Sequence, residues 1–544
     1  MKVQLIIILA LFTLGPCAAQ TVTSTKVKFN RQDTLRGSIT PERAWWDLTY
    51  YHLDIEVKPD EKFIFGKNTI QYQVLEPYQI LQVDLQNPMT IKKVMQNGTA
   101  LDFKTEGNAH FITLKENQRI GEINTIEVYY EGYPREAKRA PWDGGFSWKR
   151  DENGKHFIAT SCQGLGASVW WPNKDHMYDE VDSMLISVTI PKGLTNVSNG
   201  RLRKLEEYND KVTSHWFVSN PINNYGVNIN IGDYVNFSEV YEGENGPLDM
   251  DYWVLSYNLD KAKEHFKDAP KMMKAFEHWF GPYPFYEDSF KLVEVPYLGM
   301  EHQSSVAYGN QYKKGYLGND LSRTGWGLKF DFIIIHEAGH EWFANNITNR
   351  DIADMWIHEG FTAYSENLFL DYYYGEQAAA DYVIGTRANI RNNKPIIGQY
   401  NVNNEGSGDM YYKGANMLHT LRQLIEDDKK WRAILRGLNE TFYHQTVTTK
   451  QIEDYISRET NKDLSTFFNQ YLRDTRIPTL EYKIEEGKLS YRYVDIVEGF
   501  DMPIEIVIDG KSQWIFPNSS WQSMPYSGST FKVDEDYYIY SKQL

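Results

Sequence analysis

The stretch FIIIHEAGHEWFANN, residues 332–346, places two histidines and a glutamate directly after a run of isoleucines. On a helix, residues four apart project from the same face, so His336 and His340 point toward one spot. Glu337 lies one position on, where its carboxylate can reach a ligand held between the two imidazoles. This HExxH arrangement is typical of a Zn²⁺ site in which the glutamate acts as general base on water. With 13 histidines in the chain, a chance match has odds of roughly two in a hundred.

A catalytic zinc usually has three protein ligands and one open position, so we expect a third ligand further along the chain. The segment DMWIHEGFTAYSENLFL, residues 354–370, supplies Glu359 at the start of an expected helix. Glu366 in the same segment is an alternative third ligand. A pair of core histidines without a metal is the other interpretation, but the joint pattern favours a zinc site. The isoleucines then place the ligands on a buried helix, which fixes their geometry and keeps the site dry.

Length, amino-acid composition and net charge limit the classes of protein to which the chain can belong. A chain of 544 residues predicts two to four domains, and 41% hydrophobic with 24% charged residues is ordinary for a soluble globular protein. The formal net charge of −16 and the lack of a basic run argue against nucleic acid or an anionic membrane as partner.

The first residues, MKVQLIIILALFTLGPCAAQ, predict a signal peptide over residues 1–19. Lys2 precedes an apolar stretch, and Ala18 and Ala19 are suitable for cleavage; a lipid anchor at Cys17 is the alternative, disfavoured by the preceding proline. No later segment reaches the ~18 consecutive apolar residues that a membrane span needs. We therefore expect an exported protein, periplasmic or secreted, without a transmembrane segment. Only Cys162 would remain after cleavage, which excludes an intrachain disulfide.

The chain divides by pattern into three parts. Residues 20–236 contain alternating strand-like runs and one hairpin signal around Asn153-Gly154, which predict an antiparallel β domain. Residues 237–476 are mostly helical by spacing. Helical spacing is expected over 259–281, with an interruption by a proline, and over 411–428. Residues 477–544 return to strand patterns and predict a small β module.

Four segments together resemble the aminopeptidase N and leukotriene hydrolase family of zinc peptidases, the gluzincin aminopeptidases. HEAGH followed by WIHEGFTAYSE resembles the family's metal site, and GPYPFYEDSFKLVEVPYLGMEHQSSVAY resembles the segment leading into its Gly-x-Met-Glu-Asn motif. YYKGANML and SCQGLGASVWWPNKD resemble two further family segments, in the expected order. The resemblance implies an α+β multidomain fold: an N-terminal antiparallel β saddle domain, a thermolysin-like, mostly helical catalytic domain and a small C-terminal β-sandwich.

The resemblance also implies roles for single residues. Met300 and Glu301 match the Met-Glu of the motif that holds the substrate, with Gly299 at its variable position and Glu301 as the partner of the substrate's free α-ammonium. Leu298 replaces the first Gly of the motif and His302 its Asn. Tyr411 matches the tyrosine that donates a hydrogen bond to the developing oxyanion, while its neighbour Tyr412 is expected to be structural. Gln163 matches a glutamine that contacts the first substrate residue.

These inferences predict a zinc-dependent aminopeptidase with one Zn²⁺ per chain, bound by His336, His340 and Glu359. We expect peptides with a free N-terminus as substrates and a monomeric chain. Two alternatives stay open: a zinc endopeptidase using the same metal site, and a zinc-bearing peptide-binding protein without catalysis. An epoxide hydrolase activity, known in one branch of the family, has no specific support in the sequence.

Overall fold

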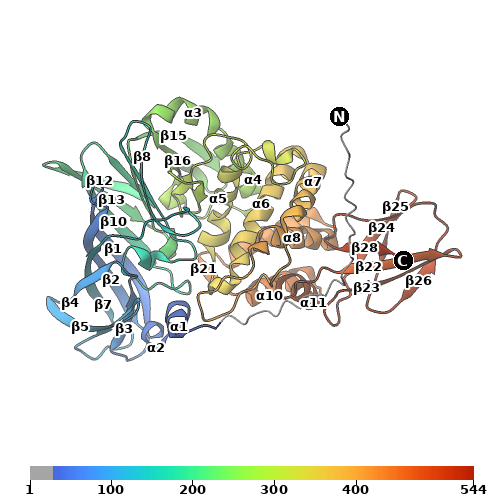
Figure 1. The fold of residues 1–544 in the computed structure, drawn as a ribbon, viewed down its shortest axis with the longest axis horizontal. Coiled ribbons are helices and arrows are strands. Elements are labelled where there is room, and N and C mark those ends of the chain that lie inside the picture. The colour runs from blue at the N-terminus through green and yellow to red at the C-terminus, as the bar shows by residue number, and fades with distance from the viewer. Residues whose placement is uncertain (1–27) are drawn as a thin grey trace, which may run out of the picture.

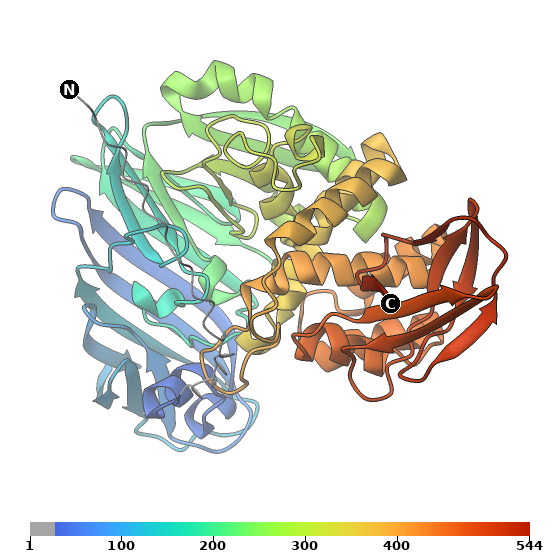
Figure 2. The same cartoon turned by 45° about the vertical axis from the view of Figure 1, so that its right-hand side comes forward.

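The computed structural model describes residues 28–544, and the expected signal peptide at residues 1–19 lies outside this range. Three parts follow one another along the chain: a β domain, a mixed domain rich in helices, and a small β module (Figure 1). This arrangement confirms the α+β class predicted from the sequence. The view in Figure 2 shows the long helices lying between the two β-rich ends of the molecule.

Within residues 28–544, the β domain contains a sheet of ten strands preceded by α1 (Arg31–Gly37) and α2 (Pro41–Ala44). Buried residues alternate along its central strands, as the period of two predicts. Neighbouring strands are antiparallel except β1 and β10, which are parallel and so correct the purely antiparallel prediction. Their spatial order is β12 (Arg201–Tyr208), β13 (Lys211–Val218), β10 (Ser183–Pro191), β1 (Trp46–Lys58), β2 (Phe63–Val74), β7 (Ile123–Gly132), β4 (Thr90–Gln96), β5 (Thr99–Glu106), β6 (Ala109–Thr113) and β3 (Ile80–Asp84).

A second sheet completes this domain and includes the predicted hairpin, in which β8 and β9 pair antiparallel. Its order is β11 (Thr195–Ser198), β14 (Ile229–Gly232), β9 (His156–Ser161) and β8 (Gly145–Arg150). The next strand, β15 (Tyr234–Gly243), already pairs with β16 of the following part. The expected boundary at residue 236 falls within β15.

The middle part combines a five-stranded sheet with the helices that surround the candidate site. The sheet order is β15, β16 (Gly246–Leu255), β17 (Phe290–Glu294), β19 (Val306–Tyr308) and β18 (Gly299–Met300), so β18 is an edge strand. The helix predicted over 259–281 is two helices, and Gly281 (φ 97°) ends the second. The helices are α3 (Leu259–His265), α4 (Asp268–Phe280), α5 (Phe332–Gly339), α6 (Trp356–Tyr374), α7 (Glu376–Thr386), α8 (Tyr412–Ile425), α9 (Asp428–Thr441), α10 (Thr449–Thr460) and α11 (Ser465–Phe468), with β20 (Ile347–Asn349) paired to β21 (Gln445–Val447).

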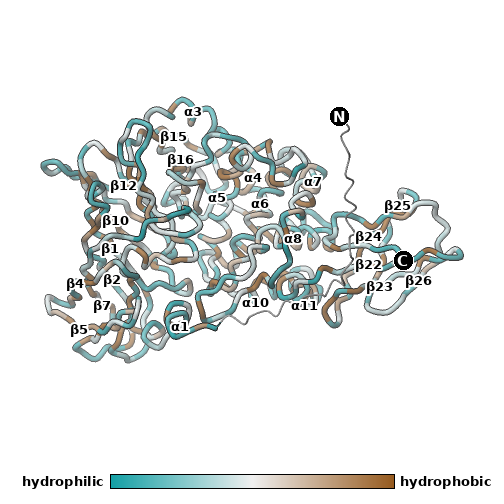
Figure 3. The backbone as a smooth tube through the Cα atoms, in the orientation of Figure 1, coloured by the Kyte–Doolittle hydropathy of each residue, from teal (hydrophilic) through white to brown (hydrophobic). Residues whose placement is uncertain are grey.

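The C-terminal module has two sheets, and its buried residues join the hydrophobic core of the helices. The first sheet contains β26 (Gln522–Pro525), β23 (Lys488–Val494), β22 (Thr479–Glu485) and β28 (Tyr540–Gln543), and the second β25 (Lys511–Ile515), β24 (Ile504–Ile508) and β27 (Phe531–Val533). Hydrophilic residues gather on peripheral segments such as the β12–β13 turn and α3 (Figure 3). Among residues 28–544, no helix is both long and apolar enough to span a membrane.

Candidate active site

One cavity of about 800 Å³ contains every site residue predicted from the sequence. Its walls come from loops of the β domain, from the edge strand β18 and from the helices of the middle part. The predicted residues that line it are Gln163, Gly299, Met300, Glu301, His336, Glu337, His340, Glu359 and Tyr411. The structure thus brings together residues from four distant segments of the chain.

Asp331 fixes the start of α5, the helix that contains His336 and has His340 as its C-cap residue. Its Oδ1 accepts hydrogen bonds from the backbone N–H of Ile333 (2.9 Å) and Ile334 (3.2 Å), which is an N-cap. Its Oδ2 accepts one from the Tyr308 hydroxyl (2.8 Å) and lies 2.6 Å from Nε2 of His265. This fully buried carboxylate ties α5 to β19 and α3. Sequence reasoning missed it, although an acid immediately before an apolar helical run is a recognisable signal.

The three predicted metal ligands converge on one point. Oε2 of Glu359 lies 3.6 Å from Nε2 of His336 and 3.4 Å from Nε2 of His340. Neighbouring ligands of a tetrahedral zinc with bonds of 2.0–2.1 Å are about 3.3 Å apart, so the spacing fits this metal. Oε2 of Glu359 is also buried without a hydrogen-bond partner in residues 28–544, as expected of an atom reserved for a cation. Two imidazoles and one carboxylate are a usual donor set of catalytic zinc.

The far side of each imidazole is already engaged, which directs both Nε2 atoms to the metal position. Nδ1 of His336 lies 2.7 Å from Oε1 of Glu366, and Tyr382 donates a hydrogen bond to the other oxygen of that carboxylate. Nδ1 of His340 lies 3.0 Å from the carbonyl oxygen of Phe343, which can only accept, and 3.0 Å from the Thr362 hydroxyl, which can donate or accept. Such contacts orient metal-binding histidines. Glu366 therefore supports a ligand, and the structure favours Glu359 as the third one.

The electrostatics of the cavity suit Glu337 to proton transfer. Burial raises the pKa of Glu337 to about 7. The two imidazoles partly oppose this rise, and the neighbouring carboxylates reinforce it. A group with a pKa near neutral can both accept and return a proton. Burial acts on Glu359 as well, but His336 and His340 outweigh it and hold the pKa of Glu359 below its ordinary value. This carboxylate therefore stays ionised, as a metal ligand must.

Glu301 follows β18 and is held from three sides. Its Oε1 accepts hydrogen bonds from Nε2 of Gln163 (2.6 Å) and from the Tyr225 hydroxyl (3.1 Å). Nδ2 of Asn345 donates to its backbone carbonyl oxygen at 2.9 Å. Gln163 also donates to Oε1 of Glu359 at 2.7 Å, so it bridges the candidate amine anchor and the metal site. Tyr225 and Asn345 were not predicted, because no local pattern marks residues that meet only through folding.

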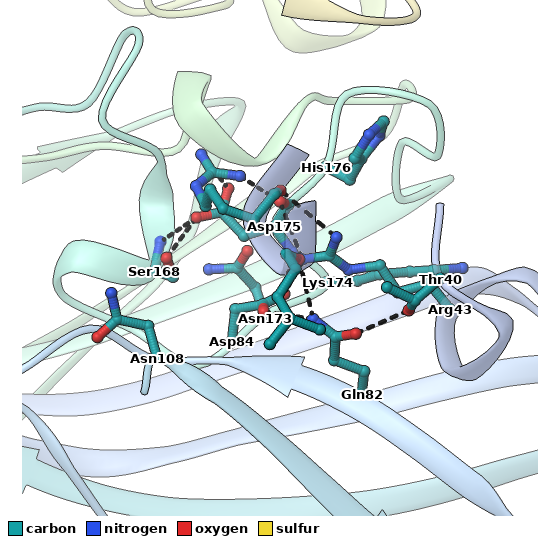
Figure 4. Close-up of polar contacts among 12 residues, drawn as sticks. Thr40, Arg43, Gln82, Asp84, Asn108, Ser168, Asn173, Lys174, Asp175 and His176 are labelled. Atoms are coloured by element: carbon teal, nitrogen blue, oxygen red, sulfur yellow. Dashed lines mark hydrogen bonds and ion pairs between the residues drawn. The ribbon is translucent and has the colours of Figure 1, made fainter. Parts of the chain in front are cut away.

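A buried polar network holds the segment that presents Gln163 (Figure 4). Asp175 accepts hydrogen bonds from the backbone N–H (3.0 Å) and the hydroxyl of Ser168, and its own backbone N–H donates to Asp84 at 3.2 Å. Arg43, fully buried, pairs with the same Asp84 carboxylate at 2.6 Å. The network therefore fastens the loop after Gln163 to the edge of the ten-stranded sheet and to α2.

Close packing requires glycine beside the general base. A Cβ on Gly299 would lie 2.8 Å from Oε1 of Glu337 and 2.8 Å from Cγ2 of Ile333. The neighbouring departure from the family motif, His302, is fully buried and does not line the cavity. Burial lowers the pKa of His302 to about 3, so the imidazole is neutral and places no positive charge near a bound amine.

Tyr411 begins the segment that enters α8, and a close helix crossing sets its position. A Cβ on Gly414 would come within 2.9 Å of Cα of Gly360, so α8 and α6 touch through two glycines. The Tyr411 ring stacks on His336, with ring centroids 5.9 Å apart and planes at 20°. This puts the phenol beside the metal position, where it lines the cavity.

The family comparison agrees with this geometry. Residues 264–471, which include α5, α6 and α8, match the peptidase family M1 domain. This confirms the resemblance to zinc peptidases inferred from the sequence motifs.

The curated relatives that the chain matches are distant in sequence. It is 22% identical to leukotriene A-4 hydrolase of Xenopus laevis over 77% of this chain and 68% of that protein. It is 20% identical to a leucyl aminopeptidase of Saccharolobus solfataricus over 78% of this chain, but only 54% of that protein. The chain thus spans about half the length of that aminopeptidase.

Among solved structures, an M1 zinc metallopeptidase variant of Deinococcus radiodurans bound to the substrate Tyr-Ser-Ala is similar, with a TM-score of 0.67 and 19% identity. The similarity covers 81% of this chain and 98% of that one. A two-domain M1 zinc metallopeptidase variant bound to L-tryptophan gives a TM-score of 0.68 over the same share of each chain. At this level of identity the likeness establishes the fold.

Proposed function

We propose that this M1-domain protein is a zinc-dependent aminopeptidase that removes single residues from the N-terminus of peptides. The position of Glu301 carries the proposal. Ligand atoms of Glu301, Glu337 and His340 all lie within 4.8 Å of one another. In a peptide, the amino nitrogen and carbonyl carbon of one residue are about 2.5 Å apart. A free amine bound to Glu301 therefore brings the first peptide bond, and not a later one, to the general base.

A bound Zn²⁺ would polarise the scissile carbonyl and lower the pKa of the attacking water. It would be held by His336, His340 and Glu359, whose donor atoms have the required spacing. Glu337 takes the proton from the water and then delivers it to the leaving amine, which its raised pKa allows. The carbon–nitrogen bond breaks, and the products are a free amino acid and a peptide one residue shorter.

Two further residues act on the substrate. Glu301 accepts hydrogen bonds from the α-ammonium, and this charge-assisted contact holds the substrate in a reactive position. The Tyr411 hydroxyl donates a hydrogen bond to the carbonyl oxygen as negative charge develops on it, a contact that strengthens in the transition state. Burial raises the pKa of Tyr411 well above its ordinary value, so the phenol keeps its proton for this purpose.

The cavity does not favour the endopeptidase alternative. An endopeptidase needs room for residues on the amino-terminal side of the scissile bond. In this cavity that place is taken by the Glu301 carboxylate, which Gln163 and Tyr225 hold in position. A binding protein without catalysis is also not favoured, because general base and oxyanion donor both line the cavity.

Hydrolysis of aminoacyl-p-nitroanilides with free and with N-acetylated amines tests the proposal. We expect cleavage of the free substrates only, lost after removal of metal by a chelator and restored by zinc. Cleavage of free and blocked substrates at similar rates would establish an endopeptidase. Zinc binding without cleavage of either would support the binding protein.

The proposal includes export through the signal peptide expected at residues 1–19, with the mature monomer in the periplasm or outside the cell. The pattern of Lys2, the apolar stretch and the two alanines supports it. N-terminal sequencing of protein recovered from the periplasmic or culture fraction should give a chain starting near residue 20. Light scattering should give the mass of one chain.

A further inference from the structure

We propose that a second cavity, of about 660 Å³, binds the distal residues of longer peptide substrates; this rests on the proposed aminopeptidase function. The cavity lies beside the catalytic one, and the two share Trp142 and Leu298 in their walls. Its remaining walls come from the β8–β9 hairpin, the end of β16, the start of α3 and the loop after β19.

Residues 295–301 line first the second cavity and then the catalytic one. Glu301, Met300 and Gly299 line the catalytic cavity, and Gly299 lies against the general base Glu337. Leu298 lines both cavities, and residues 295–297 line only the second. A peptide whose amine binds Glu301 and whose first peptide bond lies beside Glu337 would therefore continue along this segment into the second cavity.

The rise per residue of an extended chain shows which residues of a bound peptide would arrive at the second cavity. β18 is an edge strand, so one side of it is open to an extended peptide. An extended chain advances about 3.3 Å per residue, and the path from Glu301 to Leu298 spans three residues, or about 10 Å. The fourth and later residues of a peptide would then enter the second cavity, which a dipeptide or tripeptide cannot reach.

Aromatic rings make up much of the wall of the second cavity, and their polar atoms are already bonded elsewhere. The hydroxyls of Tyr297, Tyr308 and Tyr312 donate to Thr160, Asp331 and Glu294 at 2.6, 2.8 and 2.8 Å. Tyr297 and Tyr308 are themselves buried, so the apolar surface offered to a ligand comes mainly from the more exposed rings of Trp142, Tyr257 and Tyr312. Such a wall suits an apolar or aromatic side chain.

The rim adds positive charge. Lys261 and Lys313 line the cavity, are exposed, and bond only to neutral amide oxygens, at 3.4 and 2.9 Å, among residues 28–544. Of the two acids in the wall, Glu294 is buried and already accepts three hydrogen bonds, and Glu152 is exposed. The two positive charges of the lysines outnumber the single exposed negative charge, so the rim favours an anionic group of the ligand. The favoured ligand is a peptide of five or more residues with an apolar residue followed by a carboxylate, either acidic or C-terminal.

A series of peptides of increasing length tests this subsite. All peptides share one N-terminal tripeptide, which is also tested alone, and the longer ones extend it to about seven residues. One set of extensions ends in phenylalanine and aspartate, and the other consists of glycines. For each peptide, kcat/KM is measured from release of the first residue. We expect the longer apolar-acidic peptides to be cleaved at least about tenfold more efficiently than the tripeptide, the effect of burying one apolar side chain. The double variant Lys261→Glu with Lys313→Glu should lose about threefold or more of this gain. The control is Lys263→Glu with Lys274→Glu, two exposed lysines outside the cavity with the same charge change.

The outcomes separate the subsite from the activity. Tripeptide cleavage unchanged in all variants, with the gain lost only in the cavity variant, supports the subsite. Equal cleavage of short and long peptides by the wild type overturns the subsite and leaves the aminopeptidase proposal standing. Equal losses in both double variants overturn it as well. No cleavage at any length would overturn the proposed function itself.

Discussion

Replacing Gly299 with alanine tests how closely β18, the strand that contains Gly299, packs against the general base Glu337. The added Cβ would lie 2.8 Å from Oε1 of Glu337, whereas non-bonded heavy atoms normally stay about 3.5 Å apart. Glu337 must therefore move by roughly 0.7 Å. Displacements of about 1 Å in an active site can lower the rate by about 10². We expect kcat to fall about 10- to 100-fold, with zinc content unchanged because His336 and His340 are not touched.

The assay compares this variant with Gly408→Ala on an aminoacyl-p-nitroanilide. Gly408 lines the same cavity, but an added Cβ there meets nothing within 4 Å, so the control should keep wild-type kcat. Zinc content and Tm are measured on both proteins to separate a displaced base from lost metal or lost stability. Wild-type kcat in Gly299→Ala would refute the packing argument, and so would a loss that parallels loss of zinc.

Three further predictions concern separate parts of the structure. Glu366→Gln should weaken zinc binding about 10- to 100-fold in chelator competition, because the carboxylate orients His336, and excess zinc should restore activity. Tyr411→Phe should lower kcat by about 10²- to 10³-fold with little change in KM, since the hydroxyl contact is made in the transition state; a change in KM alone would contradict this role. Burial lowers the pKa of Lys291 to about 8, against 10.5 in the unfolded chain. Between these values the unfolded state binds more protons, so this lysine adds to stability as pH rises, by up to about 3 kcal/mol. Denaturation of wild type and Lys291→Met from pH 7 to 10.5 should show this difference in slope, and parallel curves would contradict it.

The metal site could be predicted from the sequence because its signals are local. His336 and His340 are one helical turn apart, and Glu359 lies in the first turn of the next long helix. The helices at 259–281 and 411–428 followed from spacing and from Gly281, although the first is broken after His265.

Contacts made only by folding could not be predicted. Gln163 lies 138 residues from Glu301 and 196 from Glu359, yet it bonds both. The parallel pairing of β1 with β10 likewise joins segments more than a hundred residues apart, and strand periodicity does not specify pairing direction. Glu366 remained an alternative ligand until its bond to His336 showed which way its carboxylate points.

The most direct test of the account is the preference for a free amine in wild type and in Glu301→Gln. The measurement is the ratio of kcat/KM for a free and an N-acetylated peptide of the same sequence, with zinc content determined for both proteins. The account predicts that the wild-type preference for the free amine falls by about 30-fold or more in the variant, since a buried charge contact is lost. An unchanged preference in a zinc-loaded variant would contradict the role of Glu301, and with it the assignment as an aminopeptidase.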